Sequence, residues 1–253
     1  MAQPLGSKLL RLVAEERTLY LHSATVARLF MELEARLGST VRSGPFAGLQ
    51  YPTLASSGSA LFPKLLGSYE LEVQPVLATL LQRCYRTVVD IGAGEGYYAV
   101  GIAQRLATAQ VVAYESNRMA RARLAAIATT NGVANRVDIR GLCTIEDLGV
   151  LSWEPPALVI SDCEGGEAQL LDPDRVPLLQ SADLLVELHM VRGASPLPLL
   201  TERFARTHRI TPISPQPRNP NAWPELSFLS RPDREAVLME RTDELGWALL
   251  EAF

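Results

Sequence analysis

Short apolar runs alternate with amphipathic stretches through most of the chain. Runs of aliphatic and β-branched residues, each short enough for one buried strand, occupy positions 87–91, 110–114, 133–140, 157–161 and 183–188. Between these runs, apolar residues recur every three or four positions, which is the spacing of helices that pack on a sheet. Two further strands are expected at 208–213 and, as a closing edge strand after a helix at 231–243, at 246–252. The pattern predicts an α/β fold with a mostly parallel, doubly wound, seven-stranded sheet.

The first 70 residues follow a different pattern and predict a helical and loop-rich cap, separate from a sheet domain at 71–253. Residues 7–37 are amphipathic, and one face collects Leu19, Val26, Phe30, Leu33 and Leu37. That face either packs within the chain, covers the substrate or forms a homodimer contact. Residues 41–63 form a long loop, whose apolar side chains either contact a ligand as part of a lid or pin the loop to the core.

The segment that leads into the first strand, 64–81, predicts a turn followed by a helix. Gly67 and Ser68 form the turn, and Ser68 is the expected N-cap of the helix. Glu70 then lies in the first helical turn, where a negative charge suits the helix dipole.

A glycine-rich turn follows the first strand and is the most informative stretch of the chain. Asp90 stands near the end of the strand, and Gly92, Gly94 and Gly96 then occupy alternate positions before a helical pattern begins. Glycine permits positive φ angles and lets a ligand lie against the backbone. An empty turn has no need of three glycines, so we predict that this turn binds a cofactor.

The spacing of the glycines separates two classes of cofactor. The dinucleotide fingerprint G-x-G-x-x-G needs a third glycine at position 97, which is Tyr97. The segment Asp90 to Gly96 instead resembles the first motif of the S-adenosylmethionine-dependent methyltransferases. That resemblance assigns Asp90, Gly92, Ala93, Gly94 and Gly96 to the cofactor, whose methionine part approaches the glycines. A nicotinamide-dependent oxidoreductase on a similar sheet is the alternative.

Further candidates for the cofactor site follow the second and third strands. Glu115 ends the second strand, which lies beside the glycine turn in a doubly wound sheet, and a carboxylate there can accept hydrogen bonds from both ribose hydroxyls. We predict this role for Glu115, rather than a surface salt bridge, and include its neighbour Ser116 in the site. By the same resemblance Leu142 and Cys143 line the adenine, although a buried structural thiol is the other interpretation of Cys143.

Acidic residues and a histidine follow the fourth and fifth strands. The stretch DCEGGE begins at Asp162, and the fifth strand ends in Glu187, Leu188 and His189. The carboxyl ends of the strands form the ligand-binding edge of such a sheet, and alternation points Glu187 and His189 the same way. Asp162, Glu187 and His189 therefore form either a general base with an orienting carboxylate or a hard-metal site. We predict His189 as the base and no metal; a His189 that only caps its strand is the structural alternative.

Three motifs together resemble those of the FkbM-type methyltransferases: TIEDL at 144–148, DCEGGE at 162–167 and VELH at 186–189. The usual patterns of that family are T-[LI]-D-D-L, D-x-E-G-x-E and V-E-[IL]-H, so Glu146 departs from the first one. The resemblance implies a Rossmann-like methyltransferase sheet, S-adenosyl-L-methionine as cofactor and O-methylation of a hydroxyl on a sugar or another small molecule. It also implies that Tyr69 and Asp162 border the cofactor.

The amino-acid composition limits the kinds of substrate and partner that we expect. The 253 residues carry a net charge of −4, which disfavours a nucleic-acid substrate, because phosphate binding needs a basic face. Three cysteines without a C-x-x-C pair predict neither a disulfide framework nor a zinc knuckle and suit a reducing cytoplasm. With no secretory pattern or membrane span in the sequence, we expect a cytoplasmic enzyme that acts on a small-molecule or sugar acceptor. A non-catalytic, cofactor-binding scaffold is the remaining alternative.

Overall fold

The computed structural model describes residues 24–57, 59–240 and 246–253. These residues divide into two compact units. The first unit contains the residues up to Gln74 and those from Gln216 to residue 240, and the second contains Pro75–Pro215 and the last strand. The sequence pattern does not indicate that the chain returns to the first unit at Gln216. The division predicted at residue 70 stays a prediction.

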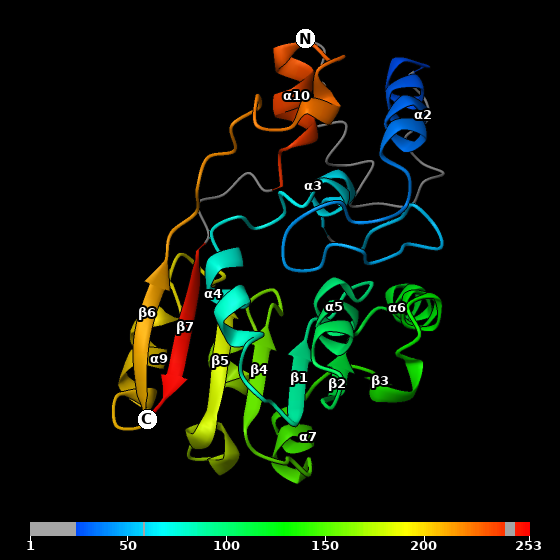
Figure 1. The fold of residues 1–253 in the computed structure, drawn as a ribbon. Coiled ribbons are helices and arrows are strands. Elements are labelled where there is room, and N and C mark those ends of the chain that lie inside the picture. The colour runs from blue at the N-terminus through cyan, green and yellow to red at the C-terminus, as the bar shows by residue number, and fades with distance from the viewer. Residues whose placement is uncertain (1–23, 58, 241–245) are drawn as a thin grey trace. The chain divides into compact units, whose positions relative to one another are not determined.

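The second unit contains a seven-stranded sheet (Figure 1). Its order is β3-β2-β1-β4-β5-β7-β6, and neighbours among β1 to β5 are parallel. The strands are β1 Thr87–Ile91, β2 Gln110–Tyr114, β3 Val137–Arg140, β4 Ala157–Ser161, β5 Ala182–Glu187, β6 His208–Ile213 and β7 Trp247–Ala252. The predicted α/β, mostly parallel, seven-stranded sheet is confirmed.

The prediction that the last strand closes the sheet as its edge is wrong. β7 lies between β5 and β6 and is antiparallel to both. Its first four residues, Trp247 to Leu250, are buried, as expected of a strand with two neighbours. β6 forms the edge instead, and it contains Pro212, which has no N–H to donate to a second neighbour.

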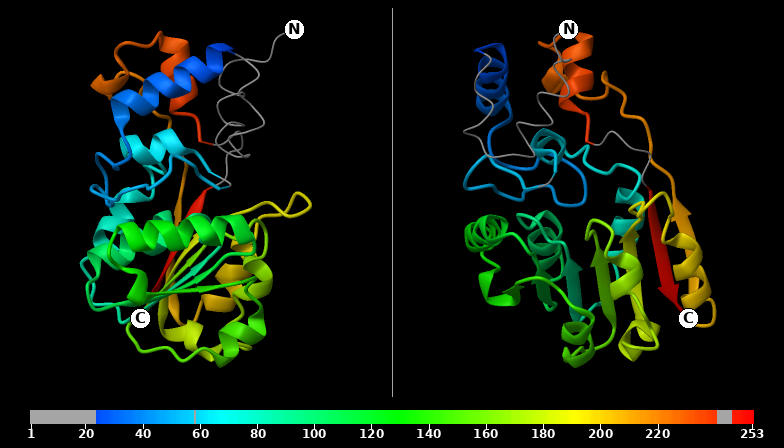
Figure 2. Two further views of the ribbon diagram at one scale, coloured as in Figure 1. Left: turned by 90° about the vertical axis from the view of Figure 1, so that its right-hand side faces the viewer. Right: turned by 180° about the vertical axis from the view of Figure 1, so that it is seen from behind.

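Helices cover both faces of this sheet (Figure 2). On one face, Val89 and Ile91 of β1 share a core cluster with Leu148 and Phe204. On the other face, the helices at residues 97–105 and 118–130 pack against β2 and β3. The helices of this unit are α4 Gln74–Leu80, which begins at the boundary, α5 Tyr97–Arg105, α6 Arg118–Thr130, α7 Ile145–Val150, α8 Glu167–Leu170 and α9 Leu197–Phe204, with 3₁₀ turns at Ala134–Arg136 and Pro177–Ser181. Burial of β1 on both sides is what a doubly wound sheet requires.

The first unit consists of short helices and loops. Its helices are α2 Ala24–Leu37, α3 Leu61–Leu66 and α10 Arg231–Val237, with a 3₁₀ turn at Pro224–Leu226. Phe30, Leu33 and Leu37 of α2 are buried, which favours packing within the chain among the three roles considered for this face. The part of the predicted helix before residue 24, with Leu19, lies outside the described residues, as do the side chain of Val26 and residues 241–243 of the helix predicted near the C-terminus.

The long loop and the turn after it differ from the prediction. Residues 61–66, at the end of the predicted loop, form α3, whose side chains are all buried. Gly67 ends this helix with a φ of 84°, so Ser68 is not an N-cap but donates its hydroxyl to the Pro63 carbonyl. Glu70 has a φ of 47° and lies outside any helix, because α4 begins only at Gln74. Burial of Phe46, Leu49, Tyr51 and Leu54 favours a loop pinned to the core.

A buried ion-pair group ties the returning segment to the rest of the first unit. The Arg218 guanidinium lies 2.7 Å from carboxylate oxygens of both Glu72 and Glu240. Glu240 also accepts a hydrogen bond from the backbone N–H of Glu70 at 2.9 Å. These contacts join positions far apart in the sequence, so no local pattern predicts them. In the described part of the chain, no helix has both the length and the apolar character needed to cross a bilayer.

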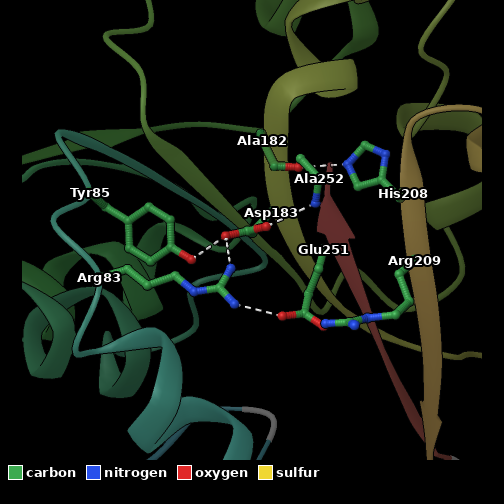
Figure 3. A network of polar contacts seen from close by, with 8 residues as sticks. All are labelled: Arg83, Tyr85, Ala182, Asp183, His208, Arg209, Glu251 and Ala252. Carbon is green, nitrogen blue, oxygen red and sulfur yellow. Dashed lines mark hydrogen bonds and ion pairs between the residues drawn. The ribbon is translucent and has the colours of Figure 1, made fainter.

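A second polar network holds together the end of the sheet at which β5 begins (Figure 3). Asp183, the second residue of β5, accepts hydrogen bonds from Tyr85 and Arg83, each at 2.5 Å, and from the Ala252 N–H at 3.0 Å. Arg83 also pairs with Glu251 of β7. Burial, with the hydrogen bond to Asp183, raises the pKa of the Tyr85 phenol, so Tyr85 stays neutral and donates. The network stabilises the sheet at the end opposite the predicted site.

Candidate active site at the carboxyl edge of the sheet

The glycine-rich turn joins β1 to α5 at the carboxyl edge of the sheet. Gly92, Gly94 and Gly96 have φ angles of 88°, 54° and 100°, a region in which side chains are strained. A Cβ on Gly92 would lie 1.6 Å from the carbonyl oxygen of Asp162, and one on Gly96 would lie 2.8 Å from the Leu124 side chain. The packing of the chain itself therefore requires two of these glycines. The sequence argument that an empty turn has no need of them is corrected on this point.

Glu115 lies directly beside this turn. Its Oε2 accepts a hydrogen bond from the Gly94 N–H at 2.8 Å, and its Oε1 accepts one from the Asn117 N–H at 2.6 Å. The Asn117 side chain in turn caps α6. Each carboxylate oxygen has a second lone pair, so Glu115 can still accept hydrogen bonds from hydroxyl groups of a ligand. The predicted ribose acceptor is therefore in contact with the predicted cofactor turn.

The other candidates for the cofactor site lie near the ends of β1, β2 and β3. Asp90 is buried within β1, and Ser116 is exposed after β2. After β3, Leu142 is 71% exposed whereas Cys143 is buried, and burial raises the pKa of the Cys143 thiol to about 12. Tyr69 belongs to the first unit, so its part in the site stays a prediction. The residues of the sheet unit offer backbone, carboxylate, hydroxyl and apolar contacts along one edge.

His189 is the centre of a second group, at the ends of β4 and β5. Its Nδ1 lies 2.7 Å from Oε1 of Glu167. Its Nε2 lies 3.6 Å from carboxylate oxygens of Asp162 and Glu164 and 3.7 Å from one of Glu187. The structure thus brings the predicted residues Asp162, Glu187 and His189 together.

Glu167 is the residue that the prediction missed. Asp162 and Glu187 were the predicted orienting carboxylates, but both lie beyond hydrogen-bond distance, whereas Glu167 makes the hydrogen bond to His189. The backbone at Glu164 and Gly165 has positive φ angles, which reverses the chain and brings Glu167 back to the histidine. Among the residues that the structure describes, the ring bonds to a side chain and not to the backbone, which disfavours the interpretation of His189 as a strand cap. The feature of the sequence that could have identified Glu167 was its place as the last acidic residue of DCEGGE.

The electrostatics of this group favour a charged pair. Burial alone would lower the pKa of His189, but the hydrogen bond to Glu167 and the charges of Asp162, Glu167 and Glu164 together raise the pKa. Burial alone would raise the pKa of Glu167, but hydrogen bonds from His189 and from backbone N–H groups lower it overall. Cys163 lies beside them as a neutral thiol, since burial and the Glu167 charge raise its pKa to about 12.

In the structure, the residues that could bind a metal differ from those that the sequence suggested. One oxygen each of Asp162 and Glu164 and one ring nitrogen of His189 lie within 4.8 Å of one another, which is the spacing of metal ligands. Glu187, which the sequence suggested as a ligand, is not in this group. The Glu164 side chain is 81% exposed, and exposed acids commonly gather without a metal. We therefore do not identify these residues as ligands.

Comparison with known proteins supports the fold. No protein-family model and no curated protein matches the sequence. The structure is similar to that of the O-methyltransferase TomG from Streptomyces achromogenes, solved in complex with SAM, with a TM-score of 0.50 and 17% identity over 79% of this chain and 82% of that one. It is also similar to a precorrin-6y C5,15-methyltransferase from Geobacter metallireducens, with a TM-score of 0.49 and 13% identity over 71% of this chain and 88% of that one. At these identities, the similarity to TomG shows the Rossmann-like methyltransferase fold.

Proposed function

We propose that this chain, which has a Rossmann-like methyltransferase fold, is an S-adenosylmethionine-dependent methyltransferase of the FkbM type. Its proposed reaction is O-methylation of a hydroxyl group on a sugar or another small molecule. The observation that carries the proposal is the contact between Glu115 and the Gly94 N–H, at the same sheet edge as His189. A ribose acceptor beside a glycine turn and a base at the same edge of the sheet are the two parts that such a reaction needs.

Most of the proposed cofactor contacts follow the first three strands. The backbone from Gly92 to Gly96 would contact its methionine part, and Glu115 would accept hydrogen bonds from its ribose hydroxyls. The remaining proposed contacts are Asp90, Ala93, Ser116, Leu142, Cys143, Asp162 and, from the first unit, Tyr69. These residues fit the group, because the Glu115 carboxylate keeps free lone pairs and Ser116 and Leu142 are exposed. When bound, S-adenosylmethionine supplies an electrophilic methyl group on a sulfonium sulfur.

His189 is the proposed general base. Its Nε2 would accept the proton of the acceptor hydroxyl, and Asp162 and Glu187 would stabilise the imidazolium ion that forms, since each has an oxygen within 3.7 Å of that nitrogen. A positioned base contributes about 10²- to 10⁴-fold to such a rate. His189 is mostly buried, with 9% of its surface exposed, so a bound acceptor would exclude much of the remaining water.

Turnover with a panel of acceptors tests this function. The protein is incubated with S-adenosylmethionine and hydroxylated sugars or metabolites, and S-adenosylhomocysteine is measured. We expect product with at least one hydroxylated acceptor and none with an analogue that lacks the hydroxyl. Cofactor binding without turnover across the panel and in cell extract would favour the non-catalytic scaffold.

A further inference from the structure

The hydrogen bond between Glu167 and His189 determines which ring nitrogen carries the proton. Oε1 of Glu167 also faces two backbone N–H groups, of Cys163 and Gly165, each at 3.3 Å. Backbone N–H groups can only donate, so Oε1 is an acceptor for all three neighbours. The proton between Glu167 and His189 therefore belongs to Nδ1 of the histidine.

Hydrogen bonds from His189 and from backbone N–H groups keep Glu167 in the charged form that this arrangement needs, because they lower its pKa although burial alone would raise it. Its side chain is fully buried, at the first residue of α8. Its neighbour Cys163 is a neutral thiol, with Sγ 3.5 Å from Oε1, so it adds no competing charge. A buried carboxylate that accepts a hydrogen bond from an imidazole has a fixed position, and the ring that bonds to it has a fixed orientation.

The other ring nitrogen is left available for chemistry. With the proton on Nδ1, a neutral His189 carries its lone pair on Nε2. The carboxylate oxygens of Asp162, Glu164 and Glu187 lie 3.6 to 3.7 Å from Nε2, which is too far for a hydrogen bond but close enough to attract a proton that arrives there. The opposite tautomer would turn a lone pair toward the Glu167 carboxylate, which is repulsive.

We propose that Glu167 is a positioning residue, which fixes His189 in the Nδ1–H tautomer and presents Nε2 to the acceptor hydroxyl. The kinetic part of this proposal rests on the proposed function, because the hydroxyl belongs to the methyl acceptor. The tautomer part stands on the contacts alone. Glu187, the last residue of β5, provides a matched comparison, because its carboxylate is also close to the ring but makes no hydrogen bond to it.

Nitrogen-15 NMR of the histidine rings tests the tautomer without cofactor or acceptor. The chain has three histidines, so His189→Asn assigns the signals of His189 by difference. In the wild-type protein, at a pH where the ring is neutral, we expect the Nδ1–H form to dominate. In Glu167→Ala, which removes the acceptor of the Nδ1–H bond, we expect a mixture of both tautomers. In Glu187→Gln the wild-type tautomer should persist.

Three results of the NMR experiment would overturn the tautomer assignment. A neutral wild-type ring with its proton on Nε2 would overturn the proposal without any variant. So would a folded Glu167→Ala protein with an unchanged tautomer, or a Glu187→Gln protein with the larger change. His208, which bonds to the Ala182 carbonyl at the far end of β5, reports whether each variant keeps the native sheet. If Glu167→Ala does not fold, Glu167→Asp takes its place in the same comparison, because its shorter side chain withdraws the carboxylate from Nδ1 but keeps the charge.

Kinetics then test positioning once an acceptor is known. For Glu167→Ala we expect kcat to fall about 10- to 10³-fold, as part of the contribution of a general base, while the acceptor KM changes less than about threefold. An unchanged kcat, or a loss confined to KM, would contradict the positioning role. A protein that shows the expected tautomers but neither binds S-adenosylmethionine nor turns it over would overturn the proposed function and not the tautomer assignment.

Discussion

The Glu115 carboxylate accepts a hydrogen bond from the backbone N–H of Gly94 at a distance of 2.8 Å. This contact joins the end of β2 to the turn after β1, so the same side chain shapes the turn and is the proposed ribose acceptor. A ligand that binds there meets a carboxylate whose position is already fixed. Such preorganisation reduces the entropy lost on binding.

Glu115→Ala is expected to weaken S-adenosylmethionine binding by about 1.5 to 3 kcal/mol, the contribution of a charged hydrogen-bond acceptor. Titration calorimetry measures the affinity, and thermal unfolding checks that the variant is folded. Glu115→Gln, which keeps one acceptor oxygen, should show a smaller loss. Unchanged affinity in a folded Glu115→Ala protein would remove Glu115 from the site.

Gly94→Val is expected to weaken cofactor binding more than Glu115→Ala does. Gly94 has a φ of 54°, which a branched side chain adopts only with strain, and the side chain would enter the space proposed for the cofactor. Gly132→Val is the matched control, because Gly132 has a φ of 69° and a Cβ there meets no atom within 4 Å. Both variants should lose stability, and only Gly94→Val should lose affinity. Equal affinities would show that the turn does not face the cofactor.

His189→Ala is expected to keep cofactor binding and to lose about 10²- to 10⁴-fold in turnover. The pH dependence of kcat/KM in the wild-type enzyme should also report the protonation of this base. The base must be unprotonated, and the pKa of His189 is raised above its usual 6.5, so kcat/KM should rise with pH through a value above 6.5. Wild-type turnover in His189→Ala would exclude the base. Activity that a chelator abolishes and Mn²⁺ restores would instead make Asp162, Glu164 and His189 metal ligands.

Tyr85→Phe is expected to cost about 1.5 to 3 kcal/mol of the free energy of unfolding, because it removes a hydrogen bond to the Asp183 carboxylate in a buried network. Urea denaturation measures this loss. Arg86→Ala is the control: the Arg86–Glu154 pair is 3.7 Å apart and both side chains are largely exposed, so its loss should cost less than about 1 kcal/mol. Similar losses in the two variants would mean that the network contributes little.

The strands of the sheet could be predicted because their signals are local. β1, β2 and β4 occupy the residues predicted for them, since each is a short run of aliphatic or β-branched residues between polar ones. The place of β7 in the sheet could not be predicted in this way, because the order of strands depends on which strands pair with one another. The sequence WALLEA indicates a buried strand but does not indicate its neighbours. The Pro212 of β6 was the usable signal that β6, and not β7, forms the edge.

The site could be predicted as a set of residues but not as a set of contacts. Strand ends at one sheet edge bring Asp162, Glu187 and His189 together, and that follows from topology. The role of Glu167 depends on a chain reversal at Gly165, which only the folded backbone shows. The need for glycine at Gly92 likewise arises from the Asp162 carbonyl, far away in the sequence.

The most direct test of the central claim is calorimetric titration of the wild-type protein with S-adenosylmethionine and, separately, with NAD. We expect saturable binding of S-adenosylmethionine at one site, weakened in Glu115→Ala, and no measurable heat with NAD. Binding of NAD without binding of S-adenosylmethionine would contradict the account and favour a nicotinamide-dependent oxidoreductase.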